Sequence, residues 1–236
     1  MLGHSHALSG GVTGLATGIL LHMSVPATAA LAGFTAGMAL LPDMDKCGSS
    51  PARSLGFLSE AVAWTIAKLS GGHRHLTHSV LGVAIFTGLA WVACYFRADI
   101  AGKAGLALLM TLTVSGALEA LRLARSHVAD LIGIGVAATE IWYGYGLRLI
   151  PLAVLVGCCT HIIGDMLTDS GCMLAYPVSR HRFHLLPEPL AFTTGTRPEL
   201  LFVDPLLTAT VVILAGWAAD PAFVAAQWHA LTVSPG

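Results

Sequence analysis

The stretch LRLIPLAVLVGCCTHIIGDMLTD, residues 147–169, joins an apolar run to a polar end that carries His161, Asp165 and Asp169. A run of this length can form a helix that crosses a bilayer, which takes about 20 residues. The three polar residues are spaced four apart, so on a helix they form one stripe. Ionisable groups at a membrane usually face one another, water or a metal ion. We therefore expect a membrane helix with a functional polar end.

The rest of the chain is also mostly apolar. It has 236 residues, of which 55% are hydrophobic and 11% charged, and its mean hydropathy is +0.75. These values predict an all-α, polytopic membrane bundle, with residues 1–236 forming a single membrane-embedded domain and residues 55–69 an amphipathic helix at the interface. The net charge of −1 gives no reason to expect a nucleic-acid partner. About seven spans are expected, from apolar runs at residues 7–21, 25–41, 79–96, 103–119, 128–142, 147–167 and 204–219.

Seven spans would divide the loops between two sides of the membrane. The N-terminus and residues 42–78, 120–127 and 168–203 would share one side, which carries nine Lys and Arg residues against three on the other. Positive charge is enriched in cytoplasmic loops, so this side is expected to face the cytoplasm. The clusters of His and Asp fall on the same side.

Two further polar clusters lie at the ends of apolar runs. The segment GHRHLTHS, residues 72–79, contains His73, His75 and His78, and its Arg74 is suited to binding a phosphate. Ser79 can cap the helix that follows. The segment LLPDMD, residues 40–45, ends an apolar run with Asp43 and Asp45, which would point the same way if the backbone were extended.

Together these residues form a mixed set of imidazole and carboxylate ligands. Such a set suits Zn²⁺, with Mn²⁺ or iron as alternatives, and its size exceeds one tetrahedral site, so two or three ions are expected. The five cysteines show no zinc-ribbon spacing and are expected to be reduced and to pack as apolar residues. The candidate metal ligands are His6, Asp43, Asp45, His73, His78, His161 and Asp165.

At these motifs the chain resembles the YdjM-type family, described as LexA-binding, inner-membrane-associated metal-dependent hydrolases. The matching pieces run in order through most of the chain: HALSG from His6, LLPDMD, GHR with THS, HIIGDMLT from His161, and YP with RHRF at residues 176–183. The resemblance implies a helical inner-membrane protein with a metal centre. Relative to the shortest members, residues 103–142 look like an extra helix pair, and His75 and Asp169 stand where the family pattern does not require a ligand. A more distant likeness to zinc-dependent phospholipases C implies phosphodiester chemistry.

We therefore expect a membrane-bound hydrolase that acts at the cytoplasmic face on a phosphoester or a lipid-linked substrate. Arg74 would orient the anionic group, and Asp169 or His75 would supply the general acid. Membrane lipid is the expected partner, while the sequence leaves the substrate and the oligomeric state open. The same ligands also fit a metal-ion transporter or sensor, or a regulatory membrane protein without turnover.

Overall fold

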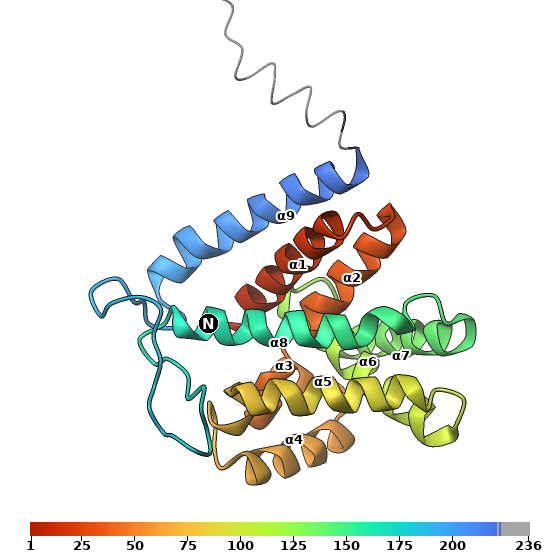
Figure 1. Cartoon of the computed structure of the whole chain (residues 1–236), viewed down its shortest axis with the longest axis horizontal. Helices are drawn as coiled ribbons and strands as arrows, with labels where there is room; N and C mark the ends of the chain where they lie inside the picture. The colour runs from red at the N-terminus through yellow and green to blue at the C-terminus, as the bar shows by residue number, and fades with distance from the viewer. Residues whose placement is uncertain (221, 223–236) are drawn as a thin grey trace, which may run out of the picture.

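The chain folds into a bundle of α-helices (Figure 1). A computed structural model describes residues 1–220 and 222, and that part contains no β-strand, only two isolated bridges, Thr168 to Phe192 and Cys172 to Phe183. The α-helices are α1 Gly3–Leu20, α2 Val25–Met38, α3 Ser50–Arg53, α4 Phe57–Ser70, α5 Val80–Tyr95, α6 Ile100–Ala120, α7 Ser126–Tyr143, α8 Ile150–Met166 and α9 Asp204–Ala219. The shorter turns are the 3₁₀ segments η1 Pro42–Asp45, η2 Leu76–His78 and η3 Leu147–Leu149, and the π-helical η4 Glu199–Val203.

The start of several helices is set by a local residue choice. Pro26, Pro151 and Pro205 occupy the first turns of α2, α8 and α9, where a missing backbone N–H costs nothing. The hydroxyl of Ser79 accepts a hydrogen bond of 3.1 Å from the backbone N–H of Gly82 and so caps α5. The predicted cap is therefore confirmed.

Glycines on α1 bring the first two helices into close contact. A Cβ at Gly10 would lie 2.5 Å from the carbonyl oxygen of Thr35, and one at Gly14 would lie 2.6 Å from the Cα of Ala32. Such positions let two helix backbones approach within a membrane. Both α1 and α2 also pack against α8, and α9 packs against α1 (Figure 1).

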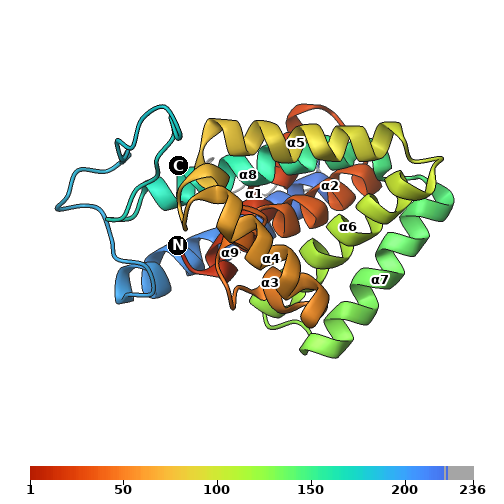
Figure 2. The same cartoon turned by 90° about the horizontal axis from the view of Figure 1, so that it is seen from below.

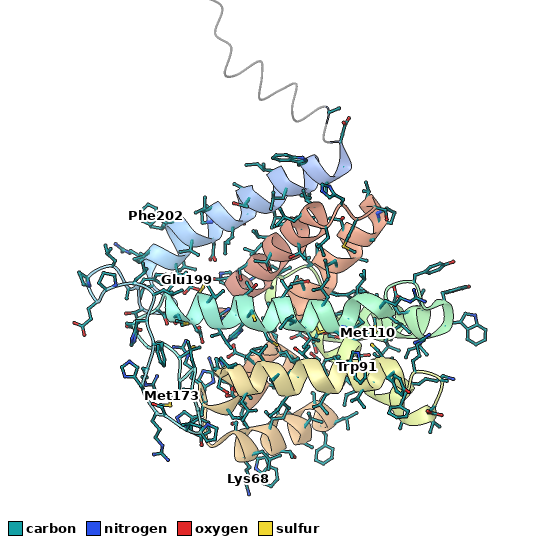
Figure 3. The ribbon with its side chains drawn as sticks, in the orientation of Figure 1. Lys68, Trp91, Met110, Met173, Glu199 and Phe202 are labelled. Carbon is teal, nitrogen blue, oxygen red and sulfur yellow. The ribbon has the colours of Figure 1, made fainter. Side chains whose placement is uncertain are left out.

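Helix α8 lies at the centre of the bundle, in contact with α1, α2 and α5, while α6 packs against α2, α3, α5 and α7 (Figure 2). Met38, Met110, Ile150 and Val154 are fully buried and form part of the main apolar core between these helices. Met110 lies inside the bundle, whereas Lys68 lies at its outer surface on α4 (Figure 3). The predicted pair at residues 103–142 corresponds to α6 and α7, and α6 is an integral part of this core.

Each of the seven predicted apolar runs contains a helix, but only four segments of the described chain are long and apolar enough to cross a membrane: Val25–Asp45, Ile100–Ala120, Leu147–Met166 and Glu199–Ala219. Helix α5 has 16 residues, fewer than the roughly 20 that a full crossing needs. Polar residues lower the hydropathy of α1 and α7, among them Asp130 and Glu140 on α7. The prediction of seven spans is therefore not confirmed, and the structure supports four candidates.

Candidate metal centre

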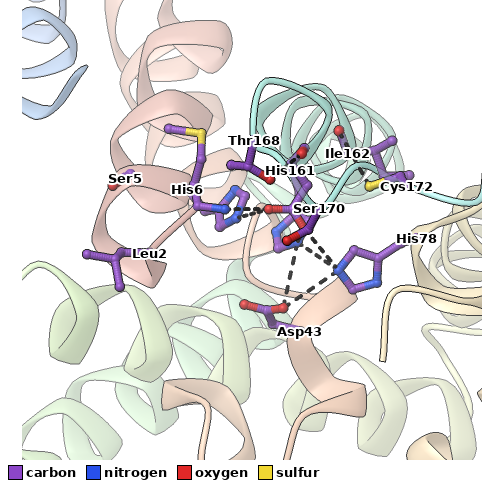
Figure 4. Close-up of polar contacts among 12 residues, drawn as sticks. Leu2, Ser5, His6, Asp43, His78, His161, Ile162, Thr168, Ser170 and Cys172 are labelled. Carbon is purple, nitrogen blue, oxygen red and sulfur yellow. Dashed lines mark hydrogen bonds and ion pairs between the residues drawn. The ribbon is translucent and has the colours of Figure 1, made fainter. Parts of the chain in front are cut away.

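Four segments that are distant in sequence meet at one end of the bundle. His6 comes from α1, Asp43 and Asp45 from η1, and His161 and Asp165 from α8, while His73 and His78 lie in the segment before α5. The labelled side chains of His6, Asp43, His78 and His161 point toward a common region (Figure 4). The seven predicted ligands fall into three overlapping groups whose ligand atoms lie within 4.8 Å of one another: His6, His161 and Asp165; Asp43, His78 and His161; and Asp45, His73 and His78.

The two aspartates of η1 approach different nitrogens of His78, Asp43 at Nε2 and Asp45 at Nδ1, so the expected extended segment is wrong at this point. Residues 42–45 form a 3₁₀ turn, in which positions two apart lie on different faces. Asp43 Oδ1 lies 3.6 Å from His78 Nε2. Asp45 instead accepts hydrogen bonds from His73 Nδ1 at 2.8 Å and from the hydroxyl of Thr77 at 2.5 Å.

These hydrogen bonds assign the protons on the ring of His78. The Thr77 hydroxyl has one proton and donates it to Asp45, so its oxygen accepts from His78 Nδ1, 2.9 Å away. A neutral imidazole that donates from Nδ1 has a lone pair on Nε2. In the neutral form of His78, the lone pair is therefore on Nε2, which faces the interior.

His161 is oriented in the same way by the backbone of α2. Its Nδ1 donates to the carbonyl oxygen of Ala39 at 2.6 Å, which leaves a lone pair on Nε2. The close approach of α8 to this backbone depends on Gly157, where a Cβ would lie 2.7 Å from the amide nitrogen of Ala39. The Nε2 atoms of His161 and His78 are 3.1 Å apart in a buried site, so both nitrogens could bind one proton or one metal ion between them.

Two carboxylate oxygens complete this arrangement. Asp43 Oδ1 lies 3.6 Å from His78 Nε2 and 3.8 Å from His161 Nε2, and Asp165 Oδ2 lies 3.6 and 3.7 Å from the same atoms. Four tetrahedral ligands at about 2.0–2.2 Å from a zinc ion lie about 3.3–3.6 Å from one another. Each of the two oxygens is thus spaced from the two nitrogens roughly as ligands of one tetrahedral cation would be.

The second oxygen of Asp165 has a different set of neighbours. Arg74 donates to Oδ1 at 2.9 Å, His6 Nε2 lies 3.3 Å from it, and the amino group of Met1 also contacts it. Neither ring nitrogen of His6 makes a well-oriented hydrogen bond within the described residues, and the ring stacks on His161 at 3.6 Å. His6 is therefore a buried imidazole with unused ligand capacity beside the four-atom group.

The mouth of the site is formed by the segment before α5. The side chain of His73 is 37% exposed, against 0% for His78, and Arg74 is 11% exposed. Arg74 has φ +63°, a left-handed conformation that is rare outside glycine, and it follows two glycines that also have positive φ. This irregular backbone brings His73 to Asp45 and Arg74 to Asp165 from one short loop.

The two predicted general acids lie apart from the three groups. The carboxylate of Asp169 accepts from the hydroxyls of Thr193 at 2.7 Å and Ser170 at 3.2 Å, and these bonds, with that of Thr193 dominant, lower the pKa of its carboxyl. A lowered pKa keeps this exposed group ionised at neutral pH, which is unsuited to proton donation. His75 bonds to the carbonyl of Gly71 and stacks on Tyr176.

One buried polar cluster was not predicted. Glu199, at the start of η4, is fully buried and accepts from the backbone N–H of Leu2 at 2.6 Å and of Gly195 at 2.7 Å. The hydroxyl of Ser5 lies 2.7 Å from both Glu199 and Asp204, and His4 lies 2.5 Å from Asp204. The cluster links the start of α9 to the start of α1. In the sequence it is indicated only by Glu199 and Asp204, a pair of acids at the start of an apolar run.

Comparison with known proteins gives one match. The family model described as YdjM inner membrane protein matches residues 1–231 and so confirms the family resemblance seen in the motifs. No curated protein and no solved structure matches the chain.

Proposed function

The chain belongs to the YdjM inner membrane protein family, and from this premise we propose that it is a membrane-bound, metal-dependent hydrolase acting on a phosphoester or lipid-linked substrate at the cytoplasmic face. Membership of the family supports the location in the inner membrane. The four candidate spans agree with it. The metal centre, the reaction and the side of the membrane are our proposals.

The observation that carries the proposal is the close approach of the Nε2 atoms of His78 and His161 beside two carboxylates. Two such nitrogens 3.1 Å apart in a buried site repel each other unless a proton or a metal cation lies between them. The nearby oxygens of Asp43 and Asp165 add negative charge to the same point. Both the charge and the spacing favour a divalent cation such as Zn²⁺, with Mn²⁺ or iron as alternatives.

Six of the seven candidate ligands would serve the metal centre. Asp43, His78, His161 and Asp165 would hold the first ion. His6 would hold a second ion with the other oxygen of Asp165, and that ion would displace the amino group of Met1. Asp45 would act through its hydrogen bonds, because it holds His73 directly and His78 through Thr77. Partners of this kind fix the ring orientation and tautomer of metal-bound histidines.

The remaining residues would handle the substrate. When bound, ions of this kind supply an acidified water and a positive charge that stabilises the oxygens of a phosphoester. The guanidinium of Arg74, 2.9 Å from Asp165, would hold the anionic group of the substrate. His73, with Nδ1 held by Asp45 and its ring partly exposed, would exchange a proton with the leaving group from Nε2.

The metal content of the purified protein tests the proposal. Protein purified in detergent should contain at least one equivalent of zinc, manganese or iron and should hydrolyse a generic phosphodiester or a phospholipid. His78→Ala and His161→Ala should lose most of the metal and all turnover, because each removes a ligand from the tetrahedral group. His127→Ala, a change of an exposed histidine on α7, is the matched control and should retain both.

Other outcomes would identify a different function. Full metal content in His78→Ala would refute the ligand assignment. Metal uptake by proteoliposomes without turnover would favour a transporter, and bound metal with neither turnover nor uptake would favour a regulatory role.

A further inference from the structure

An apolar groove with a volume of about 430 Å³ runs between α4, α5 and α6. It is lined only by apolar side chains and glycines. On α5 the lining extends from Phe86 to Phe96, and on α6 from Ala101 to Leu112. At 1.5 Å per residue these stretches are about 16 Å long, which is close to half of the roughly 30 Å hydrocarbon thickness of a bilayer.

One end of the groove lies on the turn that carries a candidate metal ligand. Leu41 and Met44 line the groove, and Asp43 lies between them in the sequence, on η1. The carboxylate of Asp43 faces His78 and His161. The same short turn therefore borders the apolar groove and the polar centre.

The outer wall of the groove is formed by a helix that stands away from α5 and α6. Helix α4 makes its main contacts with η1 and α3, and it turns Val62 and Ile66 toward the groove. At the far end, Phe96 is 48% exposed, so the groove opens to the surroundings of the bundle there.

The dimensions of the groove select its occupant. A volume of about 430 Å³ for the centres of water-sized molecules over about 16 Å corresponds to a channel about 8–9 Å wide between the atoms that line it. An α-helix with its side chains is about 10–12 Å wide and does not fit. A single hydrocarbon chain does fit, since carbon atoms in contact are about 4 Å apart.

We propose that this groove binds one hydrocarbon chain of an amphiphilic substrate, with the polar head of that molecule at the η1 end, beside Asp43. The identity of the polar head, a phosphate ester, rests on the proposed function. The binding of the hydrocarbon chain rests on the groove alone. It narrows the substrate class to lipids or lipid-linked phosphates and excludes small water-soluble phosphoesters as the natural substrate.

Photo-crosslinking of full-length protein in detergent tests the inference. The probe is a long-chain alkyl phosphate with a diazirine at the end of the chain. Crosslinks are expected on peptides from the second half of α5 and the first half of α6. A long-chain alcohol should compete with the probe, whereas inorganic phosphate alone should leave these crosslinks intact.

Variants that fill the groove provide the decisive comparison. A Cβ at Gly105 would meet only the Cβ of Ala93, at 3.6 Å, so Gly105→Leu is accommodated and places its side chain in the channel. Labelling should fall by roughly tenfold, as for a loss of about 1.4 kcal/mol in binding. Ala93→Leu fills the groove from the opposite wall and should act in the same way. Gly88→Leu is the control on α5, because a Cβ there meets nothing within 4 Å and Gly88 does not line the groove.

The outcomes separate this inference from the proposed function. Labelling that is spread over the outer faces of the helices and is equal in Gly105→Leu and wild type would reflect bulk lipid contact and would overturn the inference. Metal content, measured on the same samples, should be unchanged in Gly105→Leu. If labelling is specific to the groove but the protein binds no metal, the result would support the binding site for the hydrocarbon chain and would refute the metal-dependent hydrolase.

Discussion

At the scale of single residues, the site depends on which atom of each histidine carries the proton. Asp45 sets this for His78 through the hydroxyl of Thr77, and Ala39 sets it for His161 through its carbonyl oxygen. Neither Thr77 nor Ala39 would coordinate a metal. They nevertheless direct the Nε2 atoms of both rings to the same point, where the proposed cation would bind.

Removing the Thr77 hydroxyl should weaken metal binding without removing a ligand. Thr77→Val keeps the shape of this buried side chain but loses both hydrogen bonds, which leaves the ring of His78 free to adopt the other tautomer. Loss of such outer contacts typically costs about 10–100-fold in metal affinity. The affinity would be measured by zinc titration against a chelator of known strength.

Thr77→Ser should restore most of that affinity, because it returns the hydroxyl. Thr65→Val removes an exposed hydroxyl from α4 and serves as the control. Equal zinc affinity in Thr77→Val and wild type would show that the Asp45–Thr77–His78 chain does not orient the ligand.

The candidate residues could be predicted from the sequence, but their separate tasks could not. Histidines and aspartates are costly at the ends of apolar helices, and that cost singled out all seven that the structure brings together. The different surroundings of Asp43 and Asp45 depend on the 3₁₀ turn of η1, which leaves no distinct pattern in LLPDMD. The separation of Asp169 from the cluster arises from its contact with Thr193, a residue in a loop far along the chain.

At the scale of elements, glycine spacing determines how closely the helices approach. Gly10, Gly14 and Gly18 face α2, and Gly37 faces α6, where a Cβ would lie 2.6 Å from the carbonyl oxygen of Thr113. Gly33 lies four residues before Gly37, but a Cβ there meets nothing within 4 Å. Sequence spacing alone does not show which side of a helix has a neighbour.

Because of this difference, alanine substitutions at Gly14 and Gly33 should change the stability of the protein in opposite directions. Gly14→Ala should destabilise the protein by about 1–3 kcal/mol, because the new Cβ would lie 2.6 Å from the Cα of Ala32 and force the helices apart. Gly33→Ala, the control on α2, should be neutral or stabilising by up to about 1 kcal/mol, since alanine favours a helix and the site is open. Thermal unfolding in detergent would measure both, and a loss of stability in Gly33→Ala equal to that in Gly14→Ala would contradict the assigned contact.

At the scale of the whole molecule, the topology places all the candidate ligands at one end of the bundle. The start of α1, the end of α2, the start of α5 and the end of α8 meet there, so an even alternation of helix directions is enough to assemble the site. This clustering followed from the order of apolar runs and polar motifs. The number of helices that cross the membrane completely could not be predicted in this way, because a short or partly polar helix within a bundle has a similar sequence pattern to a membrane span.

The side of the membrane that this end faces can be tested with the two cysteines that flank the site. Cys47, after η1, is exposed. Cys172, after α8, is buried, and burial raises the pKa of its thiol to about 12, so very little of the reactive thiolate is present at pH 8. In a variant that retains only Cys47, a membrane-impermeant maleimide should label the protein in inside-out vesicles and leave it unlabelled in intact cells. A variant that retains only Cys172 should stay unlabelled from either side until it is unfolded, which controls for labelling of residues other than cysteine. Labelling of Cys47 in intact cells would place the candidate metal centre on the opposite face and would remove cytoplasmic substrates from consideration.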